Sequence, residues 1–294
     1  MCCVLRTANG FLGVEGIDVV ILYPKGKVSK VQEQQLTTLG QNITALEVDG
    51  VFDDCQDMVK TAFLDKEITS TRKLTSANSI NVARWLPQML YYFIAYRQLA
   101  ERKQPLVFSV PSGNFGNICA GMMGQNMGLP IDHFIAATNI NDAVPTYLET
   151  GEYTAVKTTP TISNAMDVGD PSNFVRIQKI YGNSFTQLKD HLTGYRFTDD
   201  ATRIAMKEIY NTSGYISDPH GAVGYLGLKD YLKQHPEKYG VFLETAHPVK
   251  FLDTVEETLE REVPMPERIQ SLLDKEKKSI EIKNYADLKS YLLS

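Results

Sequence analysis

Residues 110–121 read VPSGNFGNICAG, and they are the most informative stretch of this chain. It follows a short apolar run at residues 106–108 and precedes a helix-compatible segment that begins near Asn117. A strand, a loop with Gly113 and Gly116, and a helix start together form a site for an anion, because glycines let the backbone approach it and the helix N-terminus adds partial positive charge. The glycine spacing matches neither the dinucleotide-binding nor the ATP-binding loop pattern. The stretch therefore predicts a site for a smaller monophosphate. The alternative is a strand-to-helix turn without a ligand.

The loop Ser112–Asn117 resembles the one that holds the phosphate of pyridoxal 5′-phosphate in threonine synthases. The resemblance runs from about Ala8 to the C-terminus, and SNAMDVGDPSNF at residues 163–174 is close to a signature of the bacterial and fungal branch. Further matching stretches, in chain order, are residues 9–16, 22–28 (LYPKGKV), 74–87 (LTSANSINVARWLP), 136–149 (AATNINDAVPTYLE), 218–224 (DPHGAVG) and 244–251 (ETAHPVKF).

This resemblance implies a lyase that converts O-phosphohomoserine and water to L-threonine and phosphate. The implied fold is the second fold type of pyridoxal phosphate enzymes, which is similar to the tryptophan synthase β chain. Thr245 would donate to the ring nitrogen of the cofactor. The residues that would hold the cofactor phosphate are Gly113, Asn114, Phe115, Gly116 and Asn117.

A second oxyanion site is predicted at residues 78–84 (NSINVAR). Arginine suits a phosphate because its donors match two oxygens at once. The local pattern alone favours an ordinary helix cap, in which Ser79 or Asn81 binds free N–H groups and Arg84 is solvated. The resemblance favours the site, because threonine synthases use Asn-Ser-x-Asn-x-x-Arg to hold the substrate phosphate, and Ser79, Asn81 and Arg84 occupy those positions.

The resemblance also implies a lysine that forms the Schiff base with the cofactor and moves protons. In the family this lysine precedes the stretch that corresponds to residues 8–13, so we assign no catalytic residue in this chain. Lys25, Lys27 and Lys229 are not credible substitutes. We therefore expect an N-terminally truncated threonine synthase that is inactive as this fragment.

Two other functions stay open. The first is another enzyme of the same fold, such as a serine or threonine dehydratase or a cysteine synthase-like enzyme. Arg84 argues against it, because those substrates need no phosphate anchor. The second is a non-catalytic remnant that binds a phosphorylated metabolite or another subunit.

Alternating short apolar runs and helical patterns predict an α/β fold with two parallel-type sheets flanked by helices, incomplete at its N-terminus. We expect residues 1–97 to form the remainder of a small domain plus a linking helix, and residues 105–294 to form the large cofactor-binding domain. Residues 74–76 read as a third strand of the small domain, residues 139–190 as a long functional loop and residues 266–294 as a surface helix.

Composition narrows the partners. A net charge of −5 over 294 residues argues against nucleic acid, and no apolar run approaches the ~20 residues that span a bilayer. The four cysteines form no C-x-x-C pair, which indicates a reducing, cytoplasmic compartment, and Cys119 reads as a packing residue. No histidines stand at metal-ligand spacing, so we assign no metal. We expect a structural role for His220. His247 either lines the site or caps a helix. The sequence does not indicate an oligomeric state.

Overall fold

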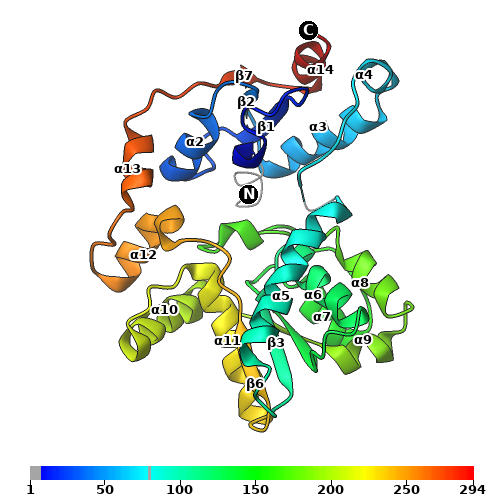
Figure 1. Ribbon diagram of the computed structural model, residues 1–294, viewed down its shortest axis with the longest axis vertical. Coiled ribbons are helices and arrows are strands. Elements are labelled where there is room, and N and C mark those ends of the chain that lie inside the picture. Colours follow the sequence, from blue (N-terminus) through cyan, green and yellow to red (C-terminus); the bar gives the residue numbers. More distant parts are fainter. Residues whose placement is uncertain (1–7, 79–80) are drawn as a thin grey trace. The chain divides into compact units, whose positions relative to one another are not determined.

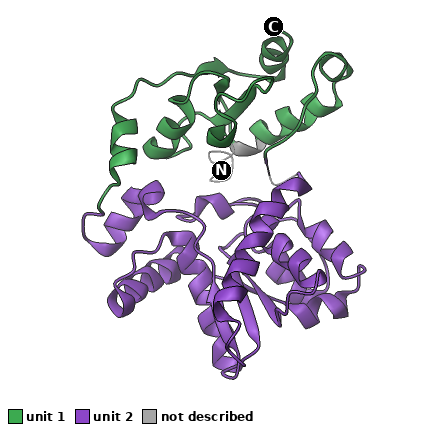
Figure 2. Cartoon of the chain, in the orientation of Figure 1, with its two compact units in different colours: residues 1–77, 264–294 green, residues 78–263 purple. Residues whose placement is uncertain are grey.

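A computed structural model describes residues 8–78 and 81–294. The chain divides into two compact units, shown in Figure 2: unit 1 comprises residues 1–77 and 264–294, and unit 2 comprises residues 78–263. Each unit is built on its own sheet, and every strand pair described is parallel. The predicted α/β class with two parallel sheets is confirmed.

The sheet of unit 1 has the strand order β1-β2-β7. Its strands are β1 (Val19–Pro24), β2 (Ile43–Val48) and β7 (Ile280–Ile282). Unit 1 includes the helices α2 (Lys30–Thr37), α3 (Phe52–Leu64), α4 (Lys66–Thr71), α13 (Glu267–Leu273) and α14 (Tyr285–Leu293). Helix α2 begins with a capping box, in which Ser29 Oγ accepts from Gln32 N and Gln32 Oε1 accepts from Ser29 N.

Two predictions about unit 1 are wrong. Residues 74–76 form no strand, and the third strand is β7, from the far end of the chain. The segment predicted as surface helix therefore contains a strand between α13 and α14. The local pattern missed β7 because a three-residue strand with two exposed residues carries almost no periodicity.

The sheet of unit 2 has the strand order β5-β4-β3-β6. Its strands are β3 (Leu106–Pro111), β4 (His133–Thr138), β5 (Leu192–Arg196) and β6 (Tyr239–Phe242). In register, Ser109 of β3 lies opposite Phe242 of β6 and Ile135 of β4. Since all four strands run the same way, their carboxyl ends share one edge, where open α/β sheets bind ligands.

Helices and helical turns precede, connect and follow these strands (Figure 1). They are η1 (Val82–Arg84), α5 (Trp85–Leu99), α6 (Gly116–Asn126), α7 (Ala143–Thr150), η2 (Asn164–Met166), α8 (Phe174–Ile180), α9 (Phe185–His191), α10 (Asp199–Ser213), α11 (Pro219–Gln234), η3 (Pro248–Phe251) and α12 (Leu252–Leu259). Residues 139–190 are thus not one long loop, because three α-helices and a helical turn interrupt them. Strand β5, which the sequence analysis did not foresee, follows directly.

The unit boundaries differ from the expected domains. Tyr92 of α5 is fully buried, and its ring lies 5.0 Å from that of Phe108 and 6.0 Å from that of Phe134. These contacts place the linking helix in unit 2 rather than with residues 1–77. The last 31 residues return to unit 1 because β7 pairs with β2.

Candidate phosphate-binding site

The glycine loop connects β3 to α6, as the sequence predicts. Ser112 N donates to Ala137 O at 2.8 Å, which extends the β3–β4 pairing by one residue. Phe115 then adopts a left-handed conformation (φ 59°), and its buried ring packs edge-on against Phe174. No side chain caps α6 at this N-cap position. Because the first N–H groups of a helix have no partner within the helix, the start of α6 offers donors to an anion.

Gly113 is in close contact with the backbone of η2. A Cβ atom at this position would lie 2.6 Å from Met166 Cα and 3.0 Å from Ala165 O. Only glycine fits here without moving one of the two backbones. The loop thus packs directly against η2 beside the uncapped start of α6, and we call the loop, η2 and this helix start the cradle. The free N–H groups at the helix start suit the phosphate group that the sequence predicts.

The two asparagines of the loop are anchored to the protein. Asn114 Oδ1 accepts from Ser172 N at 2.7 Å and from Ser172 Oγ at 2.9 Å. Asn117 Oδ1 accepts from Tyr92 Oη at 2.8 Å. These bonds fix the orientation of both amides and tie the loop to α5 and to the start of α8. The role of both asparagines as phosphate donors stays a prediction.

The predicted substrate-phosphate site lies at the start of α5. Ser79 lies outside the described residues. Asn81 caps η1, with its Oδ1 accepting from Ala83 N at 3.0 Å, and half-buried Arg84 follows as the last residue of that turn. The next residue, Trp85, belongs to the same core cluster as Phe115 of the glycine loop. The capping role of Asn81 is therefore observed, and its role toward a substrate stays a prediction.

Thr245 and His247 follow β6. Strand β6 pairs with β3, and Leu243 N donates to Ser109 O at 3.0 Å, so Thr245 and Gly113 both lie just beyond the carboxyl edge of one sheet. The Thr245 side chain is exposed. His247 caps η3, where its Nδ1 accepts from Val249 N at 3.3 Å. This contact supports the capping alternative for His247.

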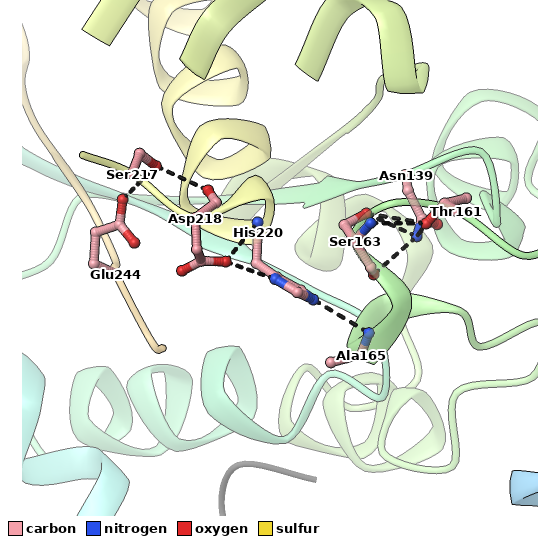
Figure 3. Close-up of polar contacts among 8 residues, drawn as sticks. All are labelled: Asn139, Thr161, Ser163, Ala165, Ser217, Asp218, His220 and Glu244. Atoms are coloured by element: carbon pink, nitrogen blue, oxygen red, sulfur yellow. Dashed lines mark hydrogen bonds and ion pairs between the residues drawn. The ribbon is translucent and has the colours of Figure 1, made fainter. Parts of the chain in front are cut away.

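A buried ionisable cluster adjoins this edge and was not predicted as a unit. Asp218 caps α11, and its Oδ1 accepts from His220 N at 2.8 Å and from His220 Nδ1 at 2.6 Å (Figure 3). Ser217 Oγ donates to Glu244 Oε1 at 2.6 Å. Burial and the charge of Asp218 raise the pKa of Glu244 to about 9. At neutral pH the Glu244 carboxyl therefore keeps its proton.

Asp218 behaves in the opposite way. Its burial alone would raise its pKa, but the hydrogen bonds from His220 hold the pKa of this carboxyl below its ordinary value. The sequence shows Asp218 and His220 two residues apart, but Glu244 is distant along the chain. Only the packing of α11 against β6 brings the three together, so no local pattern could have found the cluster.

Other reactive groups lie elsewhere. Lys229 is on α11, and its ammonium contacts Glu208 of α10 at 2.6 Å. Cys119 is fully buried in the core cluster of unit 2, which confirms the predicted packing role, and this burial raises the pKa of its thiol to about 12. Within residues 8–78 and 81–294, no three His, Cys, Asp or Glu side chains are grouped closely enough to hold a metal ion, and no helix is long and apolar enough to cross a membrane.

Two models of known protein families match the chain. The sequence profile described as "Pyridoxal-phosphate dependent enzyme" matches residues 12–244, and the profile "Threonine synthase, C-terminal" matches residues 221–292. The chain belongs to the family of pyridoxal-phosphate dependent enzymes.

Relatives narrow this class to the threonine synthases. Threonine synthase of Buchnera aphidicola is 44% identical over 97% of this chain and 66% of its own length. Threonine synthase of Escherichia coli is 46% identical over 91% of this chain and 62% of its own length. The crystal structure of the Escherichia coli threonine synthase superimposes with a TM-score of 0.92 over 99% of this chain and 67% of its own. The chain thus spans about two thirds of the length of these relatives.

Two further structures define the limits of the likeness. A PLP-bound threonine synthase from Brucella melitensis has a TM-score of 0.88 at 32% identity. Serine racemase from Dictyostelium discoideum has a TM-score of 0.58 at 14% identity, which shows a shared fold and nothing more. The dehydratase-like alternative therefore has less support than the threonine synthase assignment.

Proposed function

We propose that the chain carries the cofactor and substrate sites of a threonine synthase-like lyase, an enzyme that converts O-phosphohomoserine and water to L-threonine and phosphate in threonine biosynthesis. The observation that carries the proposal is the cradle in which uncapped α6 and the backbone of η2 meet at Gly113. The likeness to threonine synthases over nearly the whole chain supports the substrate. The cytoplasmic location predicted from cysteine usage is part of the same proposal.

Each predicted residue has a stated role in this proposal. The backbone of residues 113–117 binds the cofactor phosphate, and the Thr245 hydroxyl donates to the pyridine nitrogen. Ser79, Asn81 and Arg84 bind the substrate phosphate and orient it as the leaving group. Bound pyridoxal phosphate would supply the electron sink for proton removal next to the amino group.

The proton transfers require a lysine, and we assign none of the chain's lysines to that role. General acid–base catalysis by one positioned group contributes about 10²–10⁴-fold to a rate, and ground-state binding of a phosphate does not replace it. We therefore expect no measurable phosphate release from O-phosphohomoserine by the 294-residue chain alone.

Complementation tests both parts of the proposal. The portion of the Escherichia coli relative that this chain does not match is supplied as a separate polypeptide, and phosphate release is measured. We expect activity only in the mixture. Arg84→Ala should lower its kcat/KM about 10- to 100-fold, because a hydrogen bond to a charged group contributes about 1.5–3 kcal/mol.

The controls separate the possible errors. Arg97 lies near the end of α5, away from the predicted site, so Arg97→Ala should leave the rate unchanged. Phosphate release by the chain alone, abolished by Arg84→Ala, would show that the lysine has been misplaced. If the mixture binds the cofactor but releases no phosphate, the assignment of O-phosphohomoserine as the substrate is wrong.

A further inference from the structure

We propose that His220 is a positioning residue for the phosphate-binding cradle. Its neutral ring, oriented by Asp218, accepts the N–H of Ala165 and so holds η2 against Gly113. The consequence for cofactor binding rests on the proposed function, whereas the hydrogen-bond arrangement does not.

The first step is the orientation of the ring. His220 is 4% exposed and Asp218 is fully buried. Asp218 Oδ1 is 2.6 Å from His220 Nδ1, and as an ionised carboxylate oxygen it can only accept. Nδ1 therefore carries a proton. The ring of Phe251, 4.5 Å away between centroids, covers His220 from η3.

The second step is the other nitrogen. Ala165 N lies 3.2 Å from His220 Nε2 and donates to it. If Nε2 carried a proton, that proton would point at the Ala165 N–H, and two donors would face each other. The arrangement therefore requires the neutral ring with its proton on Nδ1. The side chain thus bridges the start of α11 and the turn η2 (Figure 3).

The third step connects this bridge to the cradle. Ala165 O and Met166 Cα are the atoms that a Cβ on Gly113 would meet. The hydrogen bond from Ala165 to His220 therefore acts on the turn that defines one wall of the cradle. Moving η2 away from α11 would change the space next to Gly113.

A second set of contacts holds the segment around η2, and its donor is Asn139, the residue that follows β4. Asn139 Nδ2 donates to Thr161 Oγ1 at 2.8 Å, to Ser163 Oγ at 3.1 Å and to Asp167 Oδ1 at 2.9 Å. These bonds fix the two sides of η2 but not its central N–H. Among the described residues, His220 Nε2 is the acceptor for the Ala165 N–H.

Glu244 adds no negative charge to the bridge between His220 and Ala165, because its carboxyl is protonated. Its Oε2 and Asp218 Oδ2 are both closed to solvent, and the charge of Asp218 helps to keep the proton on Glu244. Because Glu244 is neutral, Asp218 carries the one negative charge at the start of α11 and stays an acceptor toward His220. The other ionisable groups that interact with the cluster are Asp167, on the segment after η2, and Tyr215, before α11.

The experiment begins with the unmodified chain, which needs no variant to fold. Two-dimensional ¹H–¹⁵N spectra of the imidazoles report which nitrogen carries the proton. We expect a proton on Nδ1 of His220 and none on Nε2. A proton on Nε2 would overturn the proposal.

Two matched variants test the consequence. His220→Gln places an oxygen near the Nε2 position and keeps the acceptor, whereas His220→Asn keeps only a donor toward Asp218. The exchange of the Ala165 amide and the binding of pyridoxamine 5′-phosphate are measured for both. We expect the Asn variant to exchange about threefold to tenfold faster and to bind that much more weakly, as one lost hydrogen bond predicts, with the Gln variant close to the original.

Equal behaviour of the two variants would refute the positioning role. A different outcome is diagnostic of the proposed function: if no form of the chain binds the probe but Ala165 exchange follows the Gln-versus-Asn pattern, His220 positions η2 and the cofactor assignment fails.

Discussion

At the residue scale, Glu244 shows how position changes the chemistry of a side chain. It is half-buried, its Oε2 atom is closed to solvent, and it lies beside Asp218. A Cβ on Gly221 would collide with the Glu244 carboxyl, so the glycine in DPHGAVG makes room for it. The carboxyl therefore stays protonated at a pH where an exposed glutamate is ionised.

This state predicts a pH dependence of stability. The folded-state pKa of Glu244 is raised to about 9, while the unfolded chain ionises near pH 4.5. Its contribution to stability is therefore fully present below pH 4.5 and is lost as the pH rises toward 9. Glu244→Gln, which cannot ionise, should gain stability relative to the original chain by up to about 1.4 kcal/mol per pH unit in that window.

Urea unfolding at several pH values measures this difference. The chain's one tryptophan, Trp85, lies in the core of unit 2 and reports its unfolding by fluorescence. Asp218 has a lowered pKa, so its own contribution is lost only at acid pH and does not enter the window. A stability difference that stays constant from pH 5 to pH 9 would show that Glu244 is ionised in the folded protein.

At the element scale, β7 is the clearest example of what the sequence could not predict. Strands β1, β2, β3 and β4 coincide with short apolar runs in the sequence, which a local pattern can detect. Strand β7 instead depends on pairing with β2 across more than 230 residues of chain. A short strand of this kind is set by its partner and not by its own residues.

Lys277 precedes β7 and secures the C-terminal segment to the rest of unit 1. Its ammonium lies 2.7 Å from Glu33 and 2.9 Å from Glu47, whose side chain is 4% exposed. Lys277→Met would leave the Glu47 carboxylate buried without this cation. We expect it to lower the stability of unit 1 by about 1–3 kcal/mol, the cost of an unsatisfied buried group.

Lys25 provides the matched control. It pairs with Glu281 of β7 at 2.8 Å, but both side chains are largely exposed. Lys25→Met should change stability by less than about 1 kcal/mol, as for other surface pairs. Trp85 lies in unit 2, so hydrogen exchange of the β2 amides is the measurement for unit 1. Equal effects of the two substitutions would mean that burial of Glu47 contributes nothing.

At the scale of the whole molecule, local patterns predicted the parts of the site but not their connections. The glycine loop stands between a strand and a helix as expected, because its signal lies within twelve residues. The contacts that hold it come from distant segments: η2 against Gly113, Tyr92 on Asn117, and Ser172 on Asn114. Such contacts form only in the packed fold, so they could not be predicted from local sequence patterns.

We propose that the loop between β3 and α6 binds the phosphate of a pyridoxal-type cofactor. Calorimetric titration with pyridoxamine 5′-phosphate and with pyridoxamine tests it most directly. Neither compound has an aldehyde, so neither forms Schiff bases with surface lysines, and the phosphate is their one difference.

Two alanine variants complete the measurement. Gly113→Ala places a Cβ 2.6 Å from Met166 Cα, whereas Gly124→Ala, within α6, meets no atom closer than 3.4 Å. We predict that the phosphorylated compound binds at least tenfold more tightly to the original chain and to Gly124→Ala, a difference that about 1.4 kcal/mol from one charge-assisted hydrogen bond would supply. Gly113→Ala should remove that preference. Equal binding of the two compounds to the original chain, or an unchanged preference in Gly113→Ala, would contradict the account.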